Sequence, residues 1–259
     1  MNKPPLINSS IQTLENVITV LKAGTWEWNI QTGIVTVNRF WYDMLGYEAA
    51  EPEMTMQTWQ DMIHPDDLET VMSAAKMHLD GNSDVYEVEF RLKHRNGQWV
   101  WIRSSGRIME YDGNRDPLYF CGVHIDITEK KTVQKELRAA NELFRFLFSN
   151  SSDAIVLLKG AEIMDCNPRA LTFFDCSDRN LIVGKSLLDL SPTKQPDGSE
   201  SLVRFETSLQ KAETGKPQWF AWQCQTENKE AVECEVCLKK LTSNPEGYIV
   251  ALLQDASAE

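Results

Sequence analysis

The stretch that decides the fold runs from residue 86 to residue 108 and reads YEVEFRLKH, RNG, QWVWIRSSGRI. On both sides of Arg95-Asn96-Gly97, apolar and polar residues alternate with the period of a half-buried β-strand. Asn-Gly between two such runs is a strong signal for a tight turn. The segment therefore predicts a β-hairpin with one buried face.

Further strands and helices surround this hairpin. Tyr119 to Asp126 is a strand-like apolar run, and Thr25 to Asn29 pairs with Ile34 to Val37 in a predicted opening hairpin. Between the hairpins, His64-Pro65-Asp66-Asp67 predicts the start of a long helix, because proline suits the first helical position and acids suit the first turn. Strands joined by hairpins and mixed with helices indicate a mostly antiparallel α+β domain.

The same order of elements occurs twice. Asn38 and Asn167 each open an amphipathic stretch, and Asp126 and Asp255 each close an apolar strand; both pairs are 129 residues apart. The second copy has its own hairpin signal around Glu227-Asn228-Lys229. A chain of 259 residues is long enough for two domains with separate cores.

Two segments outside the repeats predict helices. Between the repeats, Val133, Leu137, Ala140, Phe144 and Leu147 are spaced 4, 3, 4 and 3 residues apart, which is a heptad seam. Two interpretations stay open: a helix that packs on its own domain, or a parallel two-chain coiled coil. Ahead of the first repeat, the residues from Ile11 to Leu21 also place apolar side chains at helical spacing. The predicted parts are an N-terminal helical cap (1–24), a first domain (25–127), a helical linker (128–148) and a second domain (149–259).

Composition excludes several classes of function. The chain has 38 acidic and 26 basic residues, a formal net charge of −12, which argues against binding to duplex nucleic acid. Its apolar runs are too short to cross a bilayer, and its N-terminus lacks a secretion signal, so we expect a cytoplasmic location and reduced cysteines. No phosphate-binding loop, catalytic motif or metal-ligand pattern is present, so we expect no enzymatic activity and no metal site in this chain.

Cys234 and Cys237 have the C-x-x-C spacing of redox and zinc sites, but they lie in a segment that alternates like a strand. Residues three apart on a strand point to opposite faces. We therefore expect no redox or zinc pair there.

The first repeat resembles the combined PAS and PAC sequence pattern at several points in the expected order. The second is similar to PAS domains of bacterial diguanylate cyclases and sensor histidine kinases. The matching residues of the first repeat are Trp26-Glu27-Trp28, Phe40, Leu45-Gly46-Tyr47, Ile63 to Asp67, Glu89-Phe90-Arg91, Asn96-Gly97, Trp101 and Gly122 to Thr128. Those of the second are Asn167-Pro168, Ser191-Pro192, Gln195 to Gly198, Phe220-Ala221-Trp222 and Gln254-Asp255. The resemblance implies two tandem PAS folds, each a five-stranded antiparallel sheet with helices on one face and a small pocket, joined by a long helix.

Strand parity, together with resemblance to the LOV branch of the family, implies which residues face each pocket. The candidates in the first domain are Phe90, Leu92, Val100, Ile102, Phe120 and His124; those in the second are Phe174, Trp222, Cys224, Cys234 and Leu253. His124 stands where LOV domains carry a ligand-contacting glutamine, and it is either a ligand contact or a core histidine bonded to backbone. Cys224 and Cys234 are either small core residues or ligand contacts.

The resemblance leaves the ligand unknown. The reactive-cysteine motif of flavin-binding LOV domains is absent, and Leu92 and Ile102 stand where amide side chains would bind a flavin ring. Heme would need an axial ligand on the long helix, where His78 is the candidate. A small organic ligand is the favoured class, and non-covalent flavin and heme are the less favoured alternatives.

We expect the sensory region of a bacterial signalling protein. Its ligand would alter the last strand, and Asp126 or Thr128 would cap the following helix and transmit the change. Val133, Leu137 and Phe144 would pack in a homodimer formed by the linker and N-terminal helices. The partner would be an output domain outside this chain, a histidine kinase or a diguanylate cyclase. The alternative is a ligand-free PAS scaffold that only dimerises or docks other proteins.

Overall fold

The computed structural model describes residues 10–48, 51, 54–242 and 247–256. The first nine residues of the predicted N-terminal cap lie outside this description. The chain divides into two compact units, with the boundary between Leu137 and Arg138. Each unit contains one five-stranded sheet with its own helices, so each is considered separately below.

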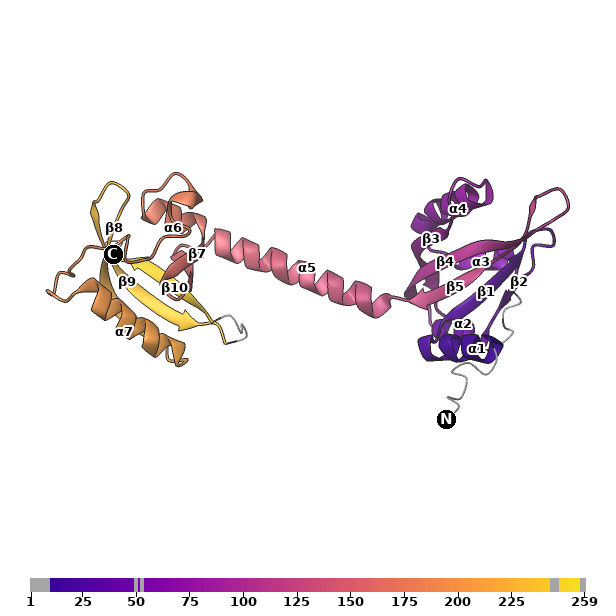
Figure 1. The fold of residues 1–259 in the computed structure, drawn as a ribbon, viewed down its shortest axis with the longest axis horizontal. Helices are drawn as coiled ribbons and strands as arrows, with labels where there is room; N and C mark the ends of the chain where they lie inside the picture. The colour runs from indigo at the N-terminus through magenta and orange to yellow at the C-terminus, as the bar shows by residue number, and fades with distance from the viewer. Residues whose placement is uncertain (1–9, 49–50, 52–53, 243–246, 257–259) are drawn as a thin grey trace, which may run out of the picture. The chain divides into compact units, whose positions relative to one another are not determined.

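The first sheet is antiparallel throughout, with the strand order β2-β1-β5-β4-β3. Its strands are β1 (Gly24–Asn29), β2 (Val35–Val37), β3 (Tyr86–Lys93), β4 (Trp99–Tyr111) and β5 (Pro117–Asp126). The accompanying helices are α1 (Ser10–Leu21), α2 (Arg39–Leu45), α3 (Met56–Met62) and α4 (Pro65–Leu79). Of these, α2 contacts β1 and α4 contacts β3 (Figure 1).

The helix starts of the first unit follow from their sequence. The Asn38 side chain accepts a hydrogen bond from the Trp41 backbone N–H and caps α2. His64 Nδ1 accepts from the Asp66 N–H, and Pro65 occupies the first position of α4. These contacts satisfy backbone donors that have no partner inside a helix. The predicted long helix after His64 is confirmed.

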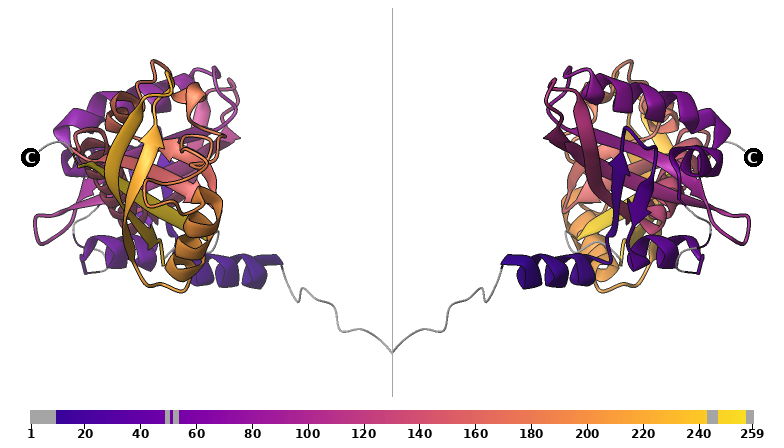
Figure 2. Two further views of the ribbon diagram at one scale, coloured as in Figure 1. Left: turned by 90° about the vertical axis from the view of Figure 1, so that its left-hand side faces the viewer. Right: turned by 90° about the vertical axis from the view of Figure 1, so that its right-hand side faces the viewer.

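The second sheet repeats this topology with the order β7-β6-β10-β9-β8. Its strands are β6 (Ala154–Lys159), β7 (Glu162–Cys166), β8 (Gln218–Gln225), β9 (Ala231–Lys240) and β10 (Tyr248–Asp255). Its helices are α6 (Pro168–Phe173), the 3-10 helix η1 (Arg179–Leu181) and α7 (Ser201–Glu213), and α7 packs on β8 and β9. Figure 2 shows the first sheet in its right-hand view and the second in its left-hand view. The predicted repeat of two antiparallel α+β folds is confirmed.

The side chains of the hairpin formed by β3 and β4 alternate between the buried and the outer face of the sheet, as predicted. Val88, Phe90 and Leu92 on β3 are buried, and so are Val100, Ile102 and Ser104 on β4. On the opposite face of β4, Trp99 is 36% exposed, and Trp101 packs beneath the Arg91 guanidinium, 5.2 Å from its ring centre. The inner face therefore belongs to the core, and the outer face carries a cation–π pair.

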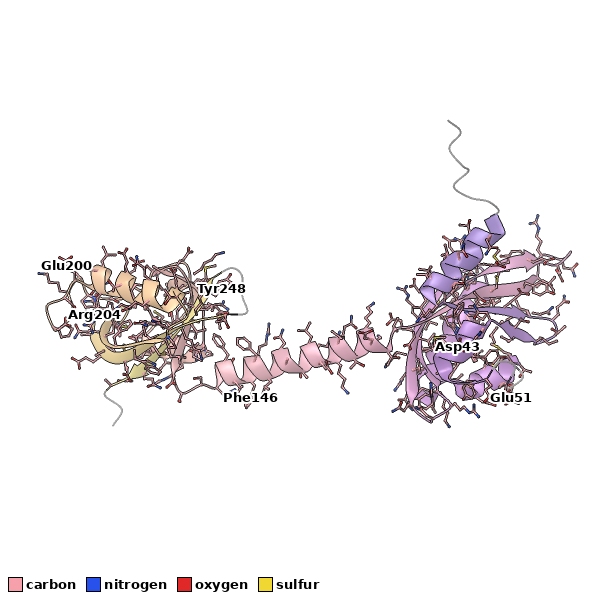
Figure 3. All side chains as sticks on the ribbon, turned by 90° about the horizontal axis from the view of Figure 1, so that it is seen from below. Asp43, Glu51, Phe146, Glu200, Arg204 and Tyr248 are labelled. Atoms are coloured by element: carbon pink, nitrogen blue, oxygen red, sulfur yellow. The ribbon has the colours of Figure 1, made fainter. Side chains whose placement is uncertain are left out.

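The helix α5 (Thr128–Ser149) occupies the predicted linker segment as one uninterrupted helix (Figure 1). None of its side chains is buried. Val133, Leu137 and Phe144 of the seam are 55%, 68% and 63% exposed, and Figure 3 labels Phe146, another exposed apolar residue of this helix. The interpretation in which the seam packs on its own domain is therefore wrong, because that packing would cover these side chains. No helix among the described residues is long and apolar enough to cross a membrane.

Candidate ligand-binding cavity of the first domain

Two glycines form the floor of the first domain's interior. The strand register places Trp26, Gly122, Gly106 and Tyr86 in one row across four strands. A Cβ atom added to Gly106 or Gly122 would lie 2.7 Å from the Trp26 ring. The indole of Trp26 therefore lies directly on the glycine backbone, where any side chain would displace it. This packing explains why the sequence has glycine twice inside its longest strands.

Above this floor is a cavity of about 40 Å³. Aromatic and apolar side chains from β1, β2, α2, α3, α4 and the strands β3 to β5 enclose it. The lining residues are Trp26, Trp28, Val35, Val37, Trp41, Met54, Met56, Trp59, Ala75, Tyr86, Ser104, Phe120 and His124. The space is far smaller than the roughly 300–1,000 Å³ of typical drug-sized sites. It suits a molecule of a few heavy atoms, since one water needs about 10–15 Å³ of such volume.

Four residues that line this cavity each have a buried polar group without a hydrogen-bond partner among the described residues. These groups are the indole nitrogens of Trp26 and Trp28 and the hydroxyls of Tyr86 and Ser104. Burial raises the pKa of Tyr86, and the nearby Ser104 hydroxyl opposes that shift slightly, although no hydrogen bond of ordinary geometry joins the two groups. An unpaired buried polar group costs about 1–3 kcal/mol, so four at one site need an explanation.

His124 is the fifth polar residue of the cavity wall. The Trp41 indole N–H donates to its Nδ1 at 3.0 Å, and both side chains are buried. Burial lowers the pKa of His124 to about 3, because no charged partner compensates for loss of water. The ring is therefore neutral at physiological pH. Its proton lies on Nε2, because Nδ1 must keep its lone pair for Trp41.

The sequence-based candidates divide into two groups in the structure. Phe120 and His124 line the cavity. Phe90, Leu92, Val100 and Ile102 are buried in the surrounding core, where Phe90 contacts the rings of Trp59 and His124. Sequence reasoning missed Trp26, Trp28, Trp41 and Tyr86 as cavity residues. Trp26 and Trp28 lie two residues apart on one strand, so they point to the same face; this spacing is a signal that sequence reasoning could have used.

The inner face of the second sheet has aliphatic residues at most of the corresponding positions, and Gln218 stands at the position of Tyr86. Its register places Val156, Ala251, Leu238 and Gln218 in the row that corresponds to Trp26, Gly122, Gly106 and Tyr86. In the neighbouring row, Leu253 and Val236 replace His124 and Ser104. Ala251, Leu238, Leu253 and Val236 are all at most 1% exposed. At these four positions the second interior has buried aliphatic side chains, whereas the first has two glycines and the polar residues His124 and Ser104.

The second-domain candidates are all core residues. Phe174, Trp222, Cys224, Cys234 and Leu253 belong to one buried cluster. The sulfur atoms of Cys224 and Cys234 are 3.8 Å apart, both as free thiols. Cys237 lies outside this cluster, on the other face of β9 from Cys234, as the alternation predicts. No group of three or more metal-binding side chains is found in the part of the chain that the structure describes.

The Ser191 to Gly198 motif of the second domain is explained by packing. The Trp222 indole N–H donates to Ser191 Oγ at 2.9 Å, and Gln195 Oε1 accepts the Gln223 backbone N–H at 2.7 Å. Asp197 pairs with Arg204 of α7 at 2.6 Å (Figure 3 labels Arg204). The motif fastens its loop to β8 and α7. A hollow of about 240 Å³ lies beside it, and half of the residues that border it are exposed.

Comparison with known proteins agrees with these two folds. Residues 34–124 match the family described as PAS fold, and residues 142–208 match the family described as PAS domain. The chain carries two PAS domains in tandem.

Two curated relatives are a kinase and a sensor protein by name. Sporulation kinase A of Bacillus subtilis is 21% identical over 196 residues, which cover 75% of this chain and 32% of the kinase. Sensor protein FixL of Bradyrhizobium diazoefficiens is 27% identical over 188 residues, covering 71% of this chain and 36% of the relative. The chain thus spans about a third of the length of these relatives.

Among solved structures, a sensory box histidine kinase/response regulator from Burkholderia thailandensis is 31% identical. The match covers 52% of this chain and 98% of that one, with a TM-score of 0.46.

The first PAS domain does not fit heme or flavin as it stands. His78 is buried on α4, but its Nδ1 bonds the Ser83 carbonyl at 2.8 Å and its Nε2 accepts the Ile108 N–H at 3.2 Å. Both ring nitrogens are thus in use, and His78 does not line the cavity. The cavity is also too small for either ring system.

The outer face of the first PAS domain holds the start of α5. Asp126 Oδ1 accepts the Thr128 N–H at 2.8 Å, so Asp126 is the cap. Thr128 instead accepts the Trp101 N–H through its hydroxyl at 2.9 Å. Lys131 pairs with Glu89 at 2.6 Å, lowering the pKa of Glu89, and lies 4.7 Å above the Trp101 ring. The first turn of α5 is therefore fixed to β3 and β4.

Proposed function

We propose that this chain is the sensory region of a bacterial signalling protein, in which the first PAS domain binds a small molecule and α5 carries the response onward. The cavity between the first sheet and its helices is the observation that carries this proposal. Strand β5 supports it, because the strand places His124 in the cavity wall and Asp126, two residues later, at the cap of α5. A ligand that favours one position of β5 would act on the helix start directly.

The second half of the proposal is a homodimer through α5. The exposed seam of Val133, Leu137 and Phe144 has coiled-coil spacing, and a second copy in parallel would cover it. Exposed apolar residues of α1, Leu14, Val17 and Leu21, offer a further contact. We place the protein in the cytoplasm, in keeping with its free cysteines. The output domain, a histidine kinase or a diguanylate cyclase, would lie outside this chain.

Sedimentation of the full chain tests the dimer. We expect a dimer at micromolar concentration. In Leu137→Glu, which places a charge in the seam, the dissociation constant of the dimer should rise at least 10-fold. Lys135→Glu, a charge change off the seam, is the matched control and should remain dimeric. A monomeric wild-type chain at high micromolar concentration would contradict the α5 relay.

Native mass spectrometry and absorption spectra of the purified chain test the sensing role. A retained small mass, or a thermal shift with members of a metabolite panel, supports it. The packed interior of the second PAS domain favours an alternative for that domain, a ligand-free scaffold that supports dimerisation. If neither domain responds to any small molecule, the scaffold role applies to the whole chain.

A further inference from the structure

The hydrogen-bonding groups of the first cavity are all capable of donating. Trp26 and Trp28 each present an indole N–H, which cannot accept a hydrogen bond. The Tyr86 and Ser104 hydroxyls are 3% and 0% exposed at the residue level and have no partner among the described residues. A guest that satisfies these groups must therefore present acceptor atoms.

His124 adds a fifth donor for a geometric reason. Its Nδ1 accepts the Trp41 N–H at 3.0 Å, which leaves the proton of the neutral ring on Nε2. Protonation of Nδ1 would set two N–H donors against each other and break this bond. The Trp41 contact therefore holds His124 as a neutral donor.

The cavity offers nothing to balance a charge. Its lining contains no Lys, Arg, Asp or Glu, and it includes four tryptophans and two methionines. A carboxylate placed there would lose its water without meeting a cation, which is costly. The size of the cavity, about 40 Å³, further limits the guest to a few heavy atoms.

We propose that the first PAS domain binds a small neutral carbonyl compound, a simple ketone, aldehyde or amide, whose oxygen accepts from the donors that Trp26, Ser104 and their neighbours present. This inference rests on the proposed function, in which the same cavity binds a small molecule. The apolar body of the ligand contacts the tryptophan and methionine walls. The carbonyl oxygen, with two lone pairs, satisfies two of the orphaned donors at once.

The test uses the full chain labelled with ¹⁵N and follows the indole N–H signals of its tryptophans. Three probes of one shape separate the causes: acetone is a neutral acceptor, acetate an anionic acceptor, and isobutene lacks an acceptor. With four heavy atoms, acetone should bind no tighter than about 40 µM, so titration extends to tens of millimolar. We expect saturable shifts of the Trp26 and Trp28 signals with acetone only. Trp219, exposed in the second domain, is the internal control.

Variants identify the donors. Ser104→Ala and Trp26→Phe each remove one donor, and each should weaken acetone binding about 3- to 10-fold. Trp26 packs on the two glycines, so Trp26→Phe could unfold the domain. In that case Ser104→Ala still tests whether the donors bind acetone. Trp219→Phe should leave the affinity unchanged.

The other outcomes overturn the inference in distinguishable ways. If acetate binds as well as acetone does, the cavity is an anion site. If isobutene binds as well as acetone does, the donors do not contribute to binding. In both cases the cavity still binds a guest, so the proposed sensing role stands. If no probe moves the Trp26 or Trp28 signal, the carbonyl inference fails. If native mass spectrometry and the metabolite panel also find no ligand, the sensing role fails with it.

Discussion

The two PAS domains share one strand order and one register but have different interiors. Trp26 resting on Gly122 and Gly106 in the first domain corresponds to Val156, Ala251 and Leu238 in the second. Around a cavity, the first interior contains polar groups that have no partner among the described residues, whereas the second is one cluster of buried apolar residues that includes Trp222 and four cysteines. Backbone pairing therefore sets the architecture, and a few side chains in two rows decide whether the interior is hollow or filled.

The largest expected effect comes from filling the glycine floor. Gly122→Ala places a Cβ against the Ser105 carbonyl oxygen and 2.7 Å from the Trp26 ring. We expect the first domain to lose about 3 kcal/mol of unfolding free energy or more, because backbone on two sides cannot yield. Urea denaturation followed by tryptophan fluorescence measures it, since six of the eight tryptophans lie in this domain.

The matched change in the second domain is Ala251→Gly. It deletes one buried methyl group and should cost only about 1 kcal/mol. Similar losses from both substitutions would contradict the view that the glycine floor distinguishes the two interiors.

The next effect is a pH dependence confined to the first domain. The pKa of His124 is about 3 in the folded chain and about 6.5 when unfolded. Above pH 6.5 both states are neutral; as pH falls below 6.5 only the unfolded state takes up the proton. Stability should therefore fall by about 1.4 kcal/mol per pH unit towards pH 3.

His124→Leu copies the residue of the second domain, Leu253, and isolates this effect. It should remove the pH slope between pH 6.5 and 5, even though it leaves the Trp41 N–H without a partner. Unfolding curves across this range measure the difference between the two proteins. Equal slopes would show that His124 does not stay neutral when folded.

A smaller effect concerns the ion pair between Arg91 and Asp67 in the first domain. Arg91 donates to both Asp67 oxygens at 2.7 and 2.8 Å, and its guanidinium holds the pKa of Asp67 below the ordinary value. Asp67→Asn should cost about 1–2 kcal/mol near neutral pH. Because the folded pKa is lowered, this stabilisation is present above about pH 4 and disappears as pH falls further.

Thermal unfolding of Asp67→Asn at pH 7 and pH 3 provides the measurement. The variant should be less stable than the wild type at pH 7 and nearly equal at pH 3. Asp197→Asn, which breaks the exposed Asp197–Arg204 pair of the second domain, is the control and should change stability less. A larger loss of stability from Asp197→Asn would contradict the view that the Asp67–Arg91 pair stabilises its domain more than the Asp197–Arg204 pair does.

The smallest effect compares two buried indoles. Trp222 donates to Ser191 Oγ, whereas the Trp26 nitrogen has no partner among the described residues. Trp222→Phe loses a ring and a hydrogen bond, but Trp26→Phe loses only a ring. We expect Trp222→Phe to cost about 1 kcal/mol more, by urea denaturation. The reverse order would mean that Trp26 is already satisfied, for example by water.

Local signals in the sequence, together with the resemblance to PAS domains, predict the architecture. Asn96-Gly97 between alternating strands and Pro65 at a helix start each depend on neighbours along the chain, and the spacing of 129 residues at two pairs of positions reveals the repeat. Hydrogen-bond geometry and the two-residue period of a strand then decide which side chains turn inward. Opposite placement of Cys234 and Cys237 follows from that period, whereas the inward placement of His124 also needed the resemblance to the LOV branch.

Which inward residues surround a cavity depends on the packing of the folded chain. Whether Phe90 or Trp26 borders it depends on how rings from several elements pack above Gly106 and Gly122, a distance relation that no local pattern encodes. The bond between Trp41 and His124, which sets the proton of the ring, joins residues 83 positions apart. The sequence placed Phe120 and His124 on the correct face, but long-range packing brought the cavity residues together and left the indole N–H groups of Trp26 and Trp28 without partners among the described residues.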